Sequence, residues 1–195
     1  MVGSKQTRPC YADGCTYGAN SPREFAFQQQ QQPVKGGYNQ QYLKQHHRNT
    51  CITGIDIADR MLVIARKKAS ELGLPFDLSE GDVQSLHFPD NSFDTAVATF
   101  VFCSVPDPVQ GLRELRRVVK PSGQILLLEH VRIDKPIIGW MMDRLNPWVV
   151  RIMGANINRR TLENVKKAGL LIESIEHLGL VKMVKMVTAK TDKAQ

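Results

Sequence analysis

The chain has 195 residues, of which 42% are hydrophobic and 23% charged; this is the composition of an ordinary globular protein and excludes disorder over the whole length. No run reaches roughly 18 apolar residues without a charge, so the sequence predicts no membrane span. The first residues, MVGSKQTRPC, lack the apolar core of a secretory signal. Four irregularly spaced cysteines are too few for a disulfide scaffold. We therefore expect a reducing, cytoplasmic environment.

The formal net charge of +7 is unevenly distributed. Residues 1–48 hold six Lys and Arg against two acids, whereas residues 49–195 hold twenty against seventeen. The sequence has no basic stripe interleaved with aromatic residues and no zinc-finger, homeodomain or RNP-like signature. This pattern argues against nucleic acid as a partner and leaves open an attraction to an anionic membrane surface or substrate.

The composition changes near residue 49. Residues 1–48 contain a run of five glutamines among scattered Gly, Pro and Ser. No period of 2 or 3.6 persists there, so we predict a low-complexity, disordered segment. Residues 49–195 have the pattern of a single α/β domain.

Strands and helices alternate in this second part. The apolar runs predict strands over residues 51–56, 75–82, 94–103 and 123–130, helices over 58–73, 107–123 and 161–170, and a closing hairpin of strands over 171–179 and 180–190. Thr161 is expected to cap the helix that it begins. Alternation of this kind predicts a doubly wound, Rossmann-like α/β fold whose mostly parallel sheet ends in an antiparallel hairpin.

Residues 137–150, IIGWMMDRLNPWVV, are rich in Trp and Met. The segment fits a lid over an apolar substrate, a helix on a membrane surface or plain core packing. Peripheral contact with a membrane is thus one expectation for this chain.

Acidic residues end two predicted strands. In doubly wound sheets ligands bind beyond the carboxyl ends of the strands. Asp56 ends one strand, where a carboxylate can accept hydrogen bonds from both hydroxyls of a ribose. Asp82 and Val83 end the next, where the carboxylate can accept from an adenine amine and the Val83 amide can reach a ring nitrogen. Either acid alone also fits a turn or a helix cap.

Several other residues carry possible chemistry. His130 ends a buried strand and is a candidate general base, with a structural histidine as the alternative. Asn158 and Arg159 either contact an anionic group of an acceptor or lead into the following helix. Cys103 lies in an apolar run and is expected to be an inert core thiol. Cys10 and Cys15 are not accompanied by a second ligand pair, and the sequence predicts no metal site.

Two segments carry a resemblance to a known family. Residues 88–94, FPDNSFD, and 116–124, RRVVKPSGQ, are characteristic of the class I S-adenosylmethionine (SAM)-dependent methyltransferases, which the chain resembles over about residues 49–190. Its pattern is most similar to the ubiquinone/menaquinone-biosynthesis C-methyltransferases, with phospholipid N-methyltransferases and thiol methyltransferases close by.

The resemblance implies SAM as the cofactor. It implies that Asp56 binds the ribose and that Asp82 and Val83 form the adenine site. It places Thr99 and Phe100 beside the methionine portion of SAM, and Phe100, Asn158 and Arg159 are the expected substrate-binding residues.

The chain departs from the family before residue 49. The family has a first strand that ends in a glycine-rich loop, E-x-G-x-G-x-G, roughly 20 residues before the ribose acid. Gly37 lies 19 residues before Asp56 and corresponds to the last glycine of that loop. The glutamine run upstream cannot form a buried strand, so the first central strand is absent or replaced. Residues 14–19 and 23–28 are candidates to fill the slot; otherwise the two neighbouring strands close up.

The expected function is methyl transfer from SAM to a small apolar acceptor, such as a quinol, a lipid amine or a thiol. The alternative is a non-catalytic remnant, or a binding module with the same fold, that does not hold the cofactor. The sequence leaves the oligomeric state open.

Overall fold

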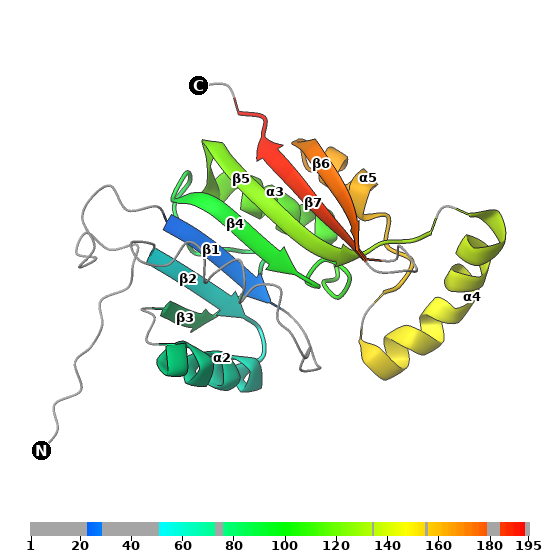
Figure 1. Ribbon diagram of the computed structural model, residues 1–195, viewed down its shortest axis with the longest axis horizontal. Coiled ribbons are helices and arrows are strands. Elements are labelled where there is room, and N and C mark those ends of the chain that lie inside the picture. The colour runs from blue at the N-terminus through cyan, green and yellow to red at the C-terminus, as the bar shows by residue number, and fades with distance from the viewer. Residues whose placement is uncertain are drawn as a thin grey trace, which may run out of the picture.

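The computed structural model describes residues 23–28, 51–72, 76–133, 135–154, 156–178 and 184–193. The strands among them form a seven-stranded sheet in the order β3-β2-β1-β4-β5-β7-β6 (Figure 1). In chain order the elements are β1 Arg23–Gln28, β2 Cys51–Asp56, α2 Asp59–Leu72, β3 Phe76–Glu80, β4 Phe93–Thr99, α3 Pro108–Val118, β5 Val119–His130, α4 Pro136–Met153, α5 Thr161–Lys167, β6 Leu170–Leu178 and β7 Val184–Thr191. β1 to β5 pair in parallel, and β7 pairs antiparallel with β5 and β6. The predicted fold class, including the antiparallel hairpin, is confirmed.

The central slot of the sheet is filled by β1. Ala26 pairs in parallel with Gly54 of β2 on one side and with Val97 of β4 on the other. The first strand is therefore replaced by residues 23–28, and the alternative in which β2 and β4 close up is wrong. This strand also corrects the expectation of disorder for these six residues; the rest of residues 1–48, the second candidate segment at 14–19 included, lies outside the described residues.

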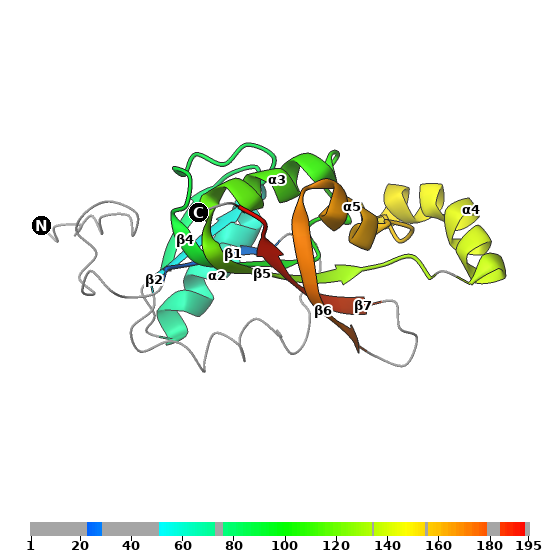
Figure 2. The ribbon, with the colours of Figure 1, turned by 90° about the horizontal axis from the view of Figure 1, so that it is seen from above.

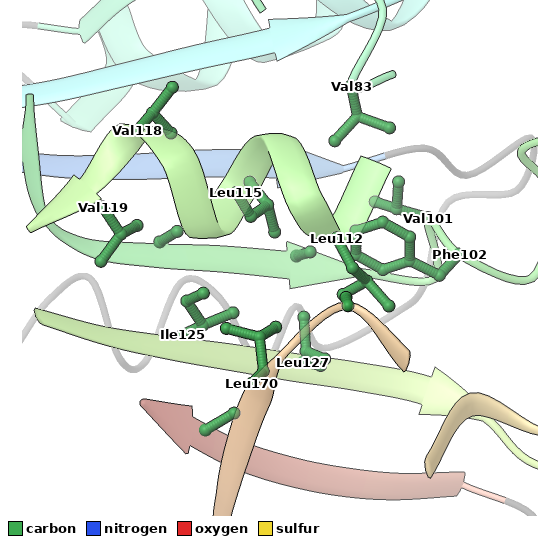
Figure 3. Close-up of a cluster of buried hydrophobic side chains, with 14 of the residues drawn as sticks. Val83, Val101, Phe102, Leu112, Leu115, Val118, Val119, Ile125, Leu127 and Leu170 are labelled. Atoms are coloured by element: carbon green, nitrogen blue, oxygen red, sulfur yellow. The ribbon is translucent and has the colours of Figure 1, made fainter. Parts of the chain in front are cut away.

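A core of aliphatic and aromatic side chains lies between the sheet and α3, with α5 at its side (Figures 2 and 3). α3 begins at Pro108 because the Asp107 carboxylate accepts hydrogen bonds from the amides of Val109 and Gln110, both at 3.0 Å. The helix then buries one apolar stripe. The stripe consists of Leu112, Leu115 and Val118, which pack onto β4 and β5. α2 covers the opposite face, where Leu62 is buried.

Several boundaries differ from the prediction. β3, predicted over 75–82, ends at Glu80, and β4, predicted over 94–103, ends at Thr99. α3 ends at Val118, and residues 119–123 open β5 instead of finishing the helix. Val119 is already extended and pairs with Phe93 of β4, and a bulge follows in the pairing of the two strands. The N-cap of α5 is Arg160, not Thr161, and no side chain caps this end. The Thr161 hydroxyl is instead directed at the backbone carbonyl of His130, at 3.5 Å.

The two segments that carry the resemblance meet at one arginine. The Arg117 guanidinium donates to the backbone carbonyls of Leu86 and Phe88, each at 2.8 Å, and pairs with Glu114 and Asp90 at 2.9 and 2.7 Å. These bonds hold the loop between β3 and β4 against α3. The segments therefore build a structural clamp.

Within the described part of the chain, no helix has the length and hydropathy needed to cross a membrane.

Candidate functional site at the carboxyl edge of the sheet

The residues expected at the site come together at one edge of the sheet. β1, β2, β4 and β5 run in the same direction, so their carboxyl ends meet at this edge (Figure 1). The edge carries, in order across the sheet, Asp82 and Val83 after β3, Asp56 at the end of β2, Thr99 at the end of β4 with Phe100 directly after it, and Glu129 and His130 at the end of β5. Gly37 lies outside the described residues.

Asp56 is the carboxylate at the end of β2. Its side chain is only 5% exposed, and Oδ1 accepts a hydrogen bond from the Ala58 amide at 2.8 Å. Burial raises the pKa of this carboxyl, and the hydrogen bonds from the next backbone amides oppose that shift in part. A carboxylate offers about four acceptor positions. Asp56 can therefore take more donors than this turn supplies.

The loop after β3 is organised by a residue that the sequence analysis missed, Gln84. Its backbone amide donates to Asp82 Oδ1 at 2.8 Å, and its side-chain nitrogen contacts both carboxylate oxygens at 3.1 and 3.0 Å. Its side-chain oxygen accepts from the Asp107 amide at 2.8 Å. Gln84 thus ties the expected adenine loop to the start of α3. A lone glutamine in a polar loop gives no sequence signal for such a bridge.

Val83 is fully buried beside Asp82. Its side chain packs against Gly111 of α3, where an added Cβ would lie 3.1 Å from Val83 Cγ1 and 3.0 Å from the Phe102 ring. A side chain at 111 would therefore require Val83 or Phe102 to shift by a few tenths of an ångström. The position of the Val83 backbone is consequently fixed by packing.

Glu129 is the second residue that the sequence analysis left without a role. Its carboxylate is completely buried and accepts from three successive amides, those of Val101 and Phe102 at 2.8 and 2.9 Å and that of Cys103 at 3.2 Å. Burial outweighs these bonds and raises the pKa of Glu129 to about 7. One sequence signal could have pointed to a role for Glu129, because it is an acid that directly follows the apolar run of β5.

The turn after β4 holds Phe100 in an uncommon conformation. Its φ is 55°, in the left-handed region that a bulky residue rarely adopts, and its amide donates to the Leu128 carbonyl at 2.8 Å. Its ring lies over the ring of His130, with centroids 4.5 Å apart and planes inclined by 32°. Backbone strain of this kind is common at functional sites.

His130 is half-buried at the end of β5. Burial lowers the pKa of its imidazole below the ordinary value of 6.5. The ring is therefore neutral at pH 7 and able to accept a proton.

Cys103 lies buried in the same turn. Burial, with the Glu129 carboxylate second, raises the pKa of its thiol to about 12. The predicted position of Cys103 in the core is confirmed.

Asn158 and Arg159 lie after α4, beside the turn that follows β4. The Asn158 side chain donates to the Asp143 carboxylate at 3.2 Å, and Arg159 Nη2 donates to the Val105 carbonyl at 2.8 Å. Arg159 Nε is buried without a hydrogen-bond partner among the described residues. In the same part of the chain no cluster of His, Cys, Asp and Glu could hold a metal ion; Cys10 and Cys15 lie outside it.

Comparison with known proteins agrees with this geometry. A family model described as "Methyltransferase domain" matches residues 34–127, so the match begins three residues before Gly37. A ubiquinone/menaquinone biosynthesis C-methyltransferase of Bdellovibrio bacteriovorus is 39% identical over 88 residues, 45% of this chain and 37% of that protein. A phosphatidylethanolamine N-methyltransferase of Cereibacter sphaeroides is 40% identical over 86 residues, 43% of this chain and 42% of that protein.

A solved structure extends the likeness to the whole fold. The SAM-dependent methyltransferase of Aquifex aeolicus superposes with a TM-score of 0.62 at 19% identity, over 87% of this chain and 82% of that one. Residues 34–127 thus match a methyltransferase domain, and the chain resembles the class I SAM-dependent methyltransferases. It spans about two-fifths of the length of the curated relatives that it matches.

SAM is the cofactor of this methyltransferase family. The described residues fit its adenosine part, because Asp56 and Asp82 are acceptors at the ends of adjacent strands, and a ribose and an adenine amine offer donors. Asp82 keeps acceptor capacity beyond its bonds to Gln84. The residues that follow β1, where the glycine-rich loop of the family lies, are outside the described part of the chain.

Proposed function

We propose that this chain binds SAM at the carboxyl edge of its sheet and transfers the methyl group to a small apolar acceptor: a quinol, a lipid amine or a thiol. The observation that carries the proposal is the buried Asp56 carboxylate, which ends β2 directly beside the central strand β1. A buried carboxylate is costly without donors. The two hydroxyls of a ribose supply such donors.

The residues of the edge have distinct roles in this proposal. When bound, SAM supplies a methyl group on a positively charged sulfur, which needs no further activation. Asp56 accepts from the ribose, Asp82 accepts from the adenine amine, and the turn held by Glu129 fixes Phe100. Alignment of donor and acceptor then accounts for most of the rate enhancement.

His130 has the proton-transfer role. As the new bond between acceptor and methyl group forms and the bond from sulfur to the methyl carbon breaks, a hydroxyl, amine or thiol acceptor has to lose a proton. The neutral imidazole of His130 can take it. Its place beside Phe100 puts this base next to the residue expected to contact the acceptor.

Two of the three acceptor classes, the quinol and the lipid amine, are supported by the relatives and by one side chain. The two curated relatives are named for a quinone-pathway C-methylation and for phosphatidylethanolamine N-methylation. Arg159 Nε, a buried donor without a partner in the described part, would be satisfied by an anionic group on the acceptor. This favours an acceptor that joins an apolar body to a polar head.

Calorimetric titration with SAM tests the binding step. We expect Asp56→Ala to weaken binding by about 1–3 kcal/mol, because donors on the ribose lose their partner. Asp59→Ala is the matched control, since Asp59 is an exposed acid three residues further along the chain. Equal affinities in the two variants would contradict the ribose assignment. A wild-type chain that does not bind SAM would support the non-catalytic alternative.

The transfer step is tested with SAM that carries a labelled methyl group. The chain is incubated separately with a short-chain quinol, with phosphatidylethanolamine and with a small aliphatic thiol, and transfer of label is measured. Label in one acceptor identifies the class. SAM binding without transfer to any of the three would refute the proposed acceptor range.

A further inference from the structure

α4 exposes an unusual number of large apolar side chains. Six of them face solvent: Ile137 (81% exposed), Trp140 (64%), Met141 (48%), Leu145 (48%), Trp148 (68%) and Ile152 (79%). Scattered exposed hydrophobic residues are normal on protein surfaces, but a contiguous group on one element marks a contact surface. We call this group the outer face of α4. Its exposure excludes core packing, one of the three possibilities that the sequence left open.

The helical period places these six side chains on one side. At about 100° per residue they fall within an arc of about 140°. The opposite side holds Met142 and Gly139, both buried. A surface helix normally turns its apolar side toward the core. In α4 the apolar outer face instead points away from the body of the protein.

Hydrogen bonds fix α4 in this orientation. Arg132 pairs with Asp143 at 2.8 Å, and its guanidinium lies where a Cβ on Gly139 would be, at 2.6 Å. Asn146 bonds to the Asn156 side chain at 3.0 Å and accepts from the Ile157 amide at the same distance. Both views show α4 projecting beyond the sheet (Figures 1 and 2). These bonds hold the outer face outward and not down over the site as a lid.

The charges of the outer face are positive. Arg144 and Arg151 fall within the same side of the helix and are exposed, and Lys135 directly precedes the helix. The acid of α4, Asp143, is already paired with Arg132. A second copy of the chain would bring arginines against arginines at such a surface, which is unfavourable. Anionic headgroups are the complementary partner.

We propose that the outer face of α4 binds the surface of an anionic phospholipid bilayer. Tryptophan and aliphatic side chains enter the boundary between headgroups and acyl chains, and the arginines lie at the level of the phosphates. The proposal does not depend on methyl transfer. It would bring the carboxyl edge of the sheet close to the lipid, because Asn156, which bonds to Asn146, also donates to the Cys103 carbonyl at 3.0 Å.

Intrinsic fluorescence offers a direct test. The chain has two tryptophans, and both lie on the outer face of α4. We expect their emission to shift to the blue on addition of phosphatidylglycerol vesicles, and much less with phosphatidylcholine vesicles at the same ionic strength. Arg144→Gln with Arg151→Gln should weaken binding to phosphatidylglycerol by roughly tenfold or more.

Vesicle sedimentation provides the second readout. Trp140→Ser with Trp148→Ser should abolish co-sedimentation with phosphatidylglycerol vesicles. Val63→Ser with Ile64→Ser is the control, since α2 also carries two exposed aliphatic residues close to lysines, and this variant should sediment like the wild type. Circular dichroism confirms that each variant is folded, and SAM titration without vesicles separates this test from the proposed function.

Three results would overturn the proposal. The first is tryptophan emission that phosphatidylglycerol vesicles do not change. The second is sedimentation that survives loss of both tryptophans, which would place the lipid contact elsewhere in the chain. The third is a blue shift that grows with protein concentration in the absence of lipid, which would show that the outer face joins two copies.

Discussion

The carboxylate of Glu129, at the end of β5, accepts a hydrogen bond from the backbone amide of Phe102 at 2.9 Å. With the amides of Val101 and Cys103 it forms the fixed end of the turn that leaves β4. A buried carboxylate without donors would be strongly destabilising. The turn and the acid therefore stabilise each other, and the strained Phe100 depends on both.

Glu129→Gln should change how stability depends on pH. The folded-state pKa is about 7, against an ordinary value of 4.5, so the folded chain holds this proton more tightly than the unfolded chain. Its contribution to stability is complete below about pH 4.5 and is lost as the pH rises through 7. The free energy of unfolding of the wild type, minus that of the variant, should fall over this range by up to about 3 kcal/mol.

Urea unfolding at a series of pH values measures this difference. Subtracting the free energy of unfolding of the variant from that of the wild type removes the contributions of other titrating groups, such as Asp56 and His130. A difference that stays constant from pH 4.5 to 8 would show that Glu129 keeps its ordinary pKa in the folded chain.

His130→Gln should separate proton transfer from cofactor binding. Loss of a general base typically costs about 10²–10⁴ in rate, whereas SAM affinity should be unchanged because the imidazole is not among the adenosine contacts. Since burial lowers the pKa of His130, the acid limb of the wild-type pH–rate profile should lie below pH 6.5. Full activity in the variant would make His130 a structural residue.

Arg117→Lys should destabilise the domain although the charge is kept. Lysine has a single terminal nitrogen and cannot replace the two guanidinium nitrogens that donate to the carbonyls of Leu86 and Phe88. We expect a loss of about 1–3 kcal/mol in the free energy of unfolding. Arg113→Lys, an exposed position on the same helix, serves as the control and should have little effect.

Gly123→Ala should be more costly than Gly81→Ala. A Cβ at 123 would lie 2.5 Å from the Asp94 carbonyl oxygen and from Val119 Cγ1, whereas one at 81 would lie 3.3 Å from the terminal methyl group of Ile55, Cδ1. Overpacking against backbone costs about 1–3 kcal/mol. Melting temperatures of the two variants provide the comparison, and equal values would show that the bulge between β4 and β5 relaxes easily.

The sequence predicted the strands and helices whose patterns are local. β4 and β5 contain the apolar runs 96–98 and 125–128, and α3 has one apolar stripe, so these elements could be predicted from the local pattern. The position of Asp56 and Asp82 at the carboxyl edge of the sheet could also be predicted, because each acid follows a strand pattern; their role as ligands stays a prediction.

What the sequence did not reveal depends on long-range partners. Gln84 and Glu129 take their roles from contacts that join residues 20 or more positions apart, which no local pattern encodes. β1 could be named only as a candidate, because REFAFQ gains its partners through pairing with two distant strands. The outward orientation of α4 likewise depends on tertiary bonds from Asn156 and Arg132.

The position of β1 has a kinetic consequence. Its pairs with β4 join residues such as Glu24 and Thr95, 71 positions apart in the chain. Closing loops of this length slows folding. β2 with β3, and β4 with β5, can pair earlier through shorter loops. We therefore expect β1 to insert late in folding, between the pair formed by β2 and β3 and the pair formed by β4 and β5. Substitutions in β1 should then accelerate unfolding more than they slow folding.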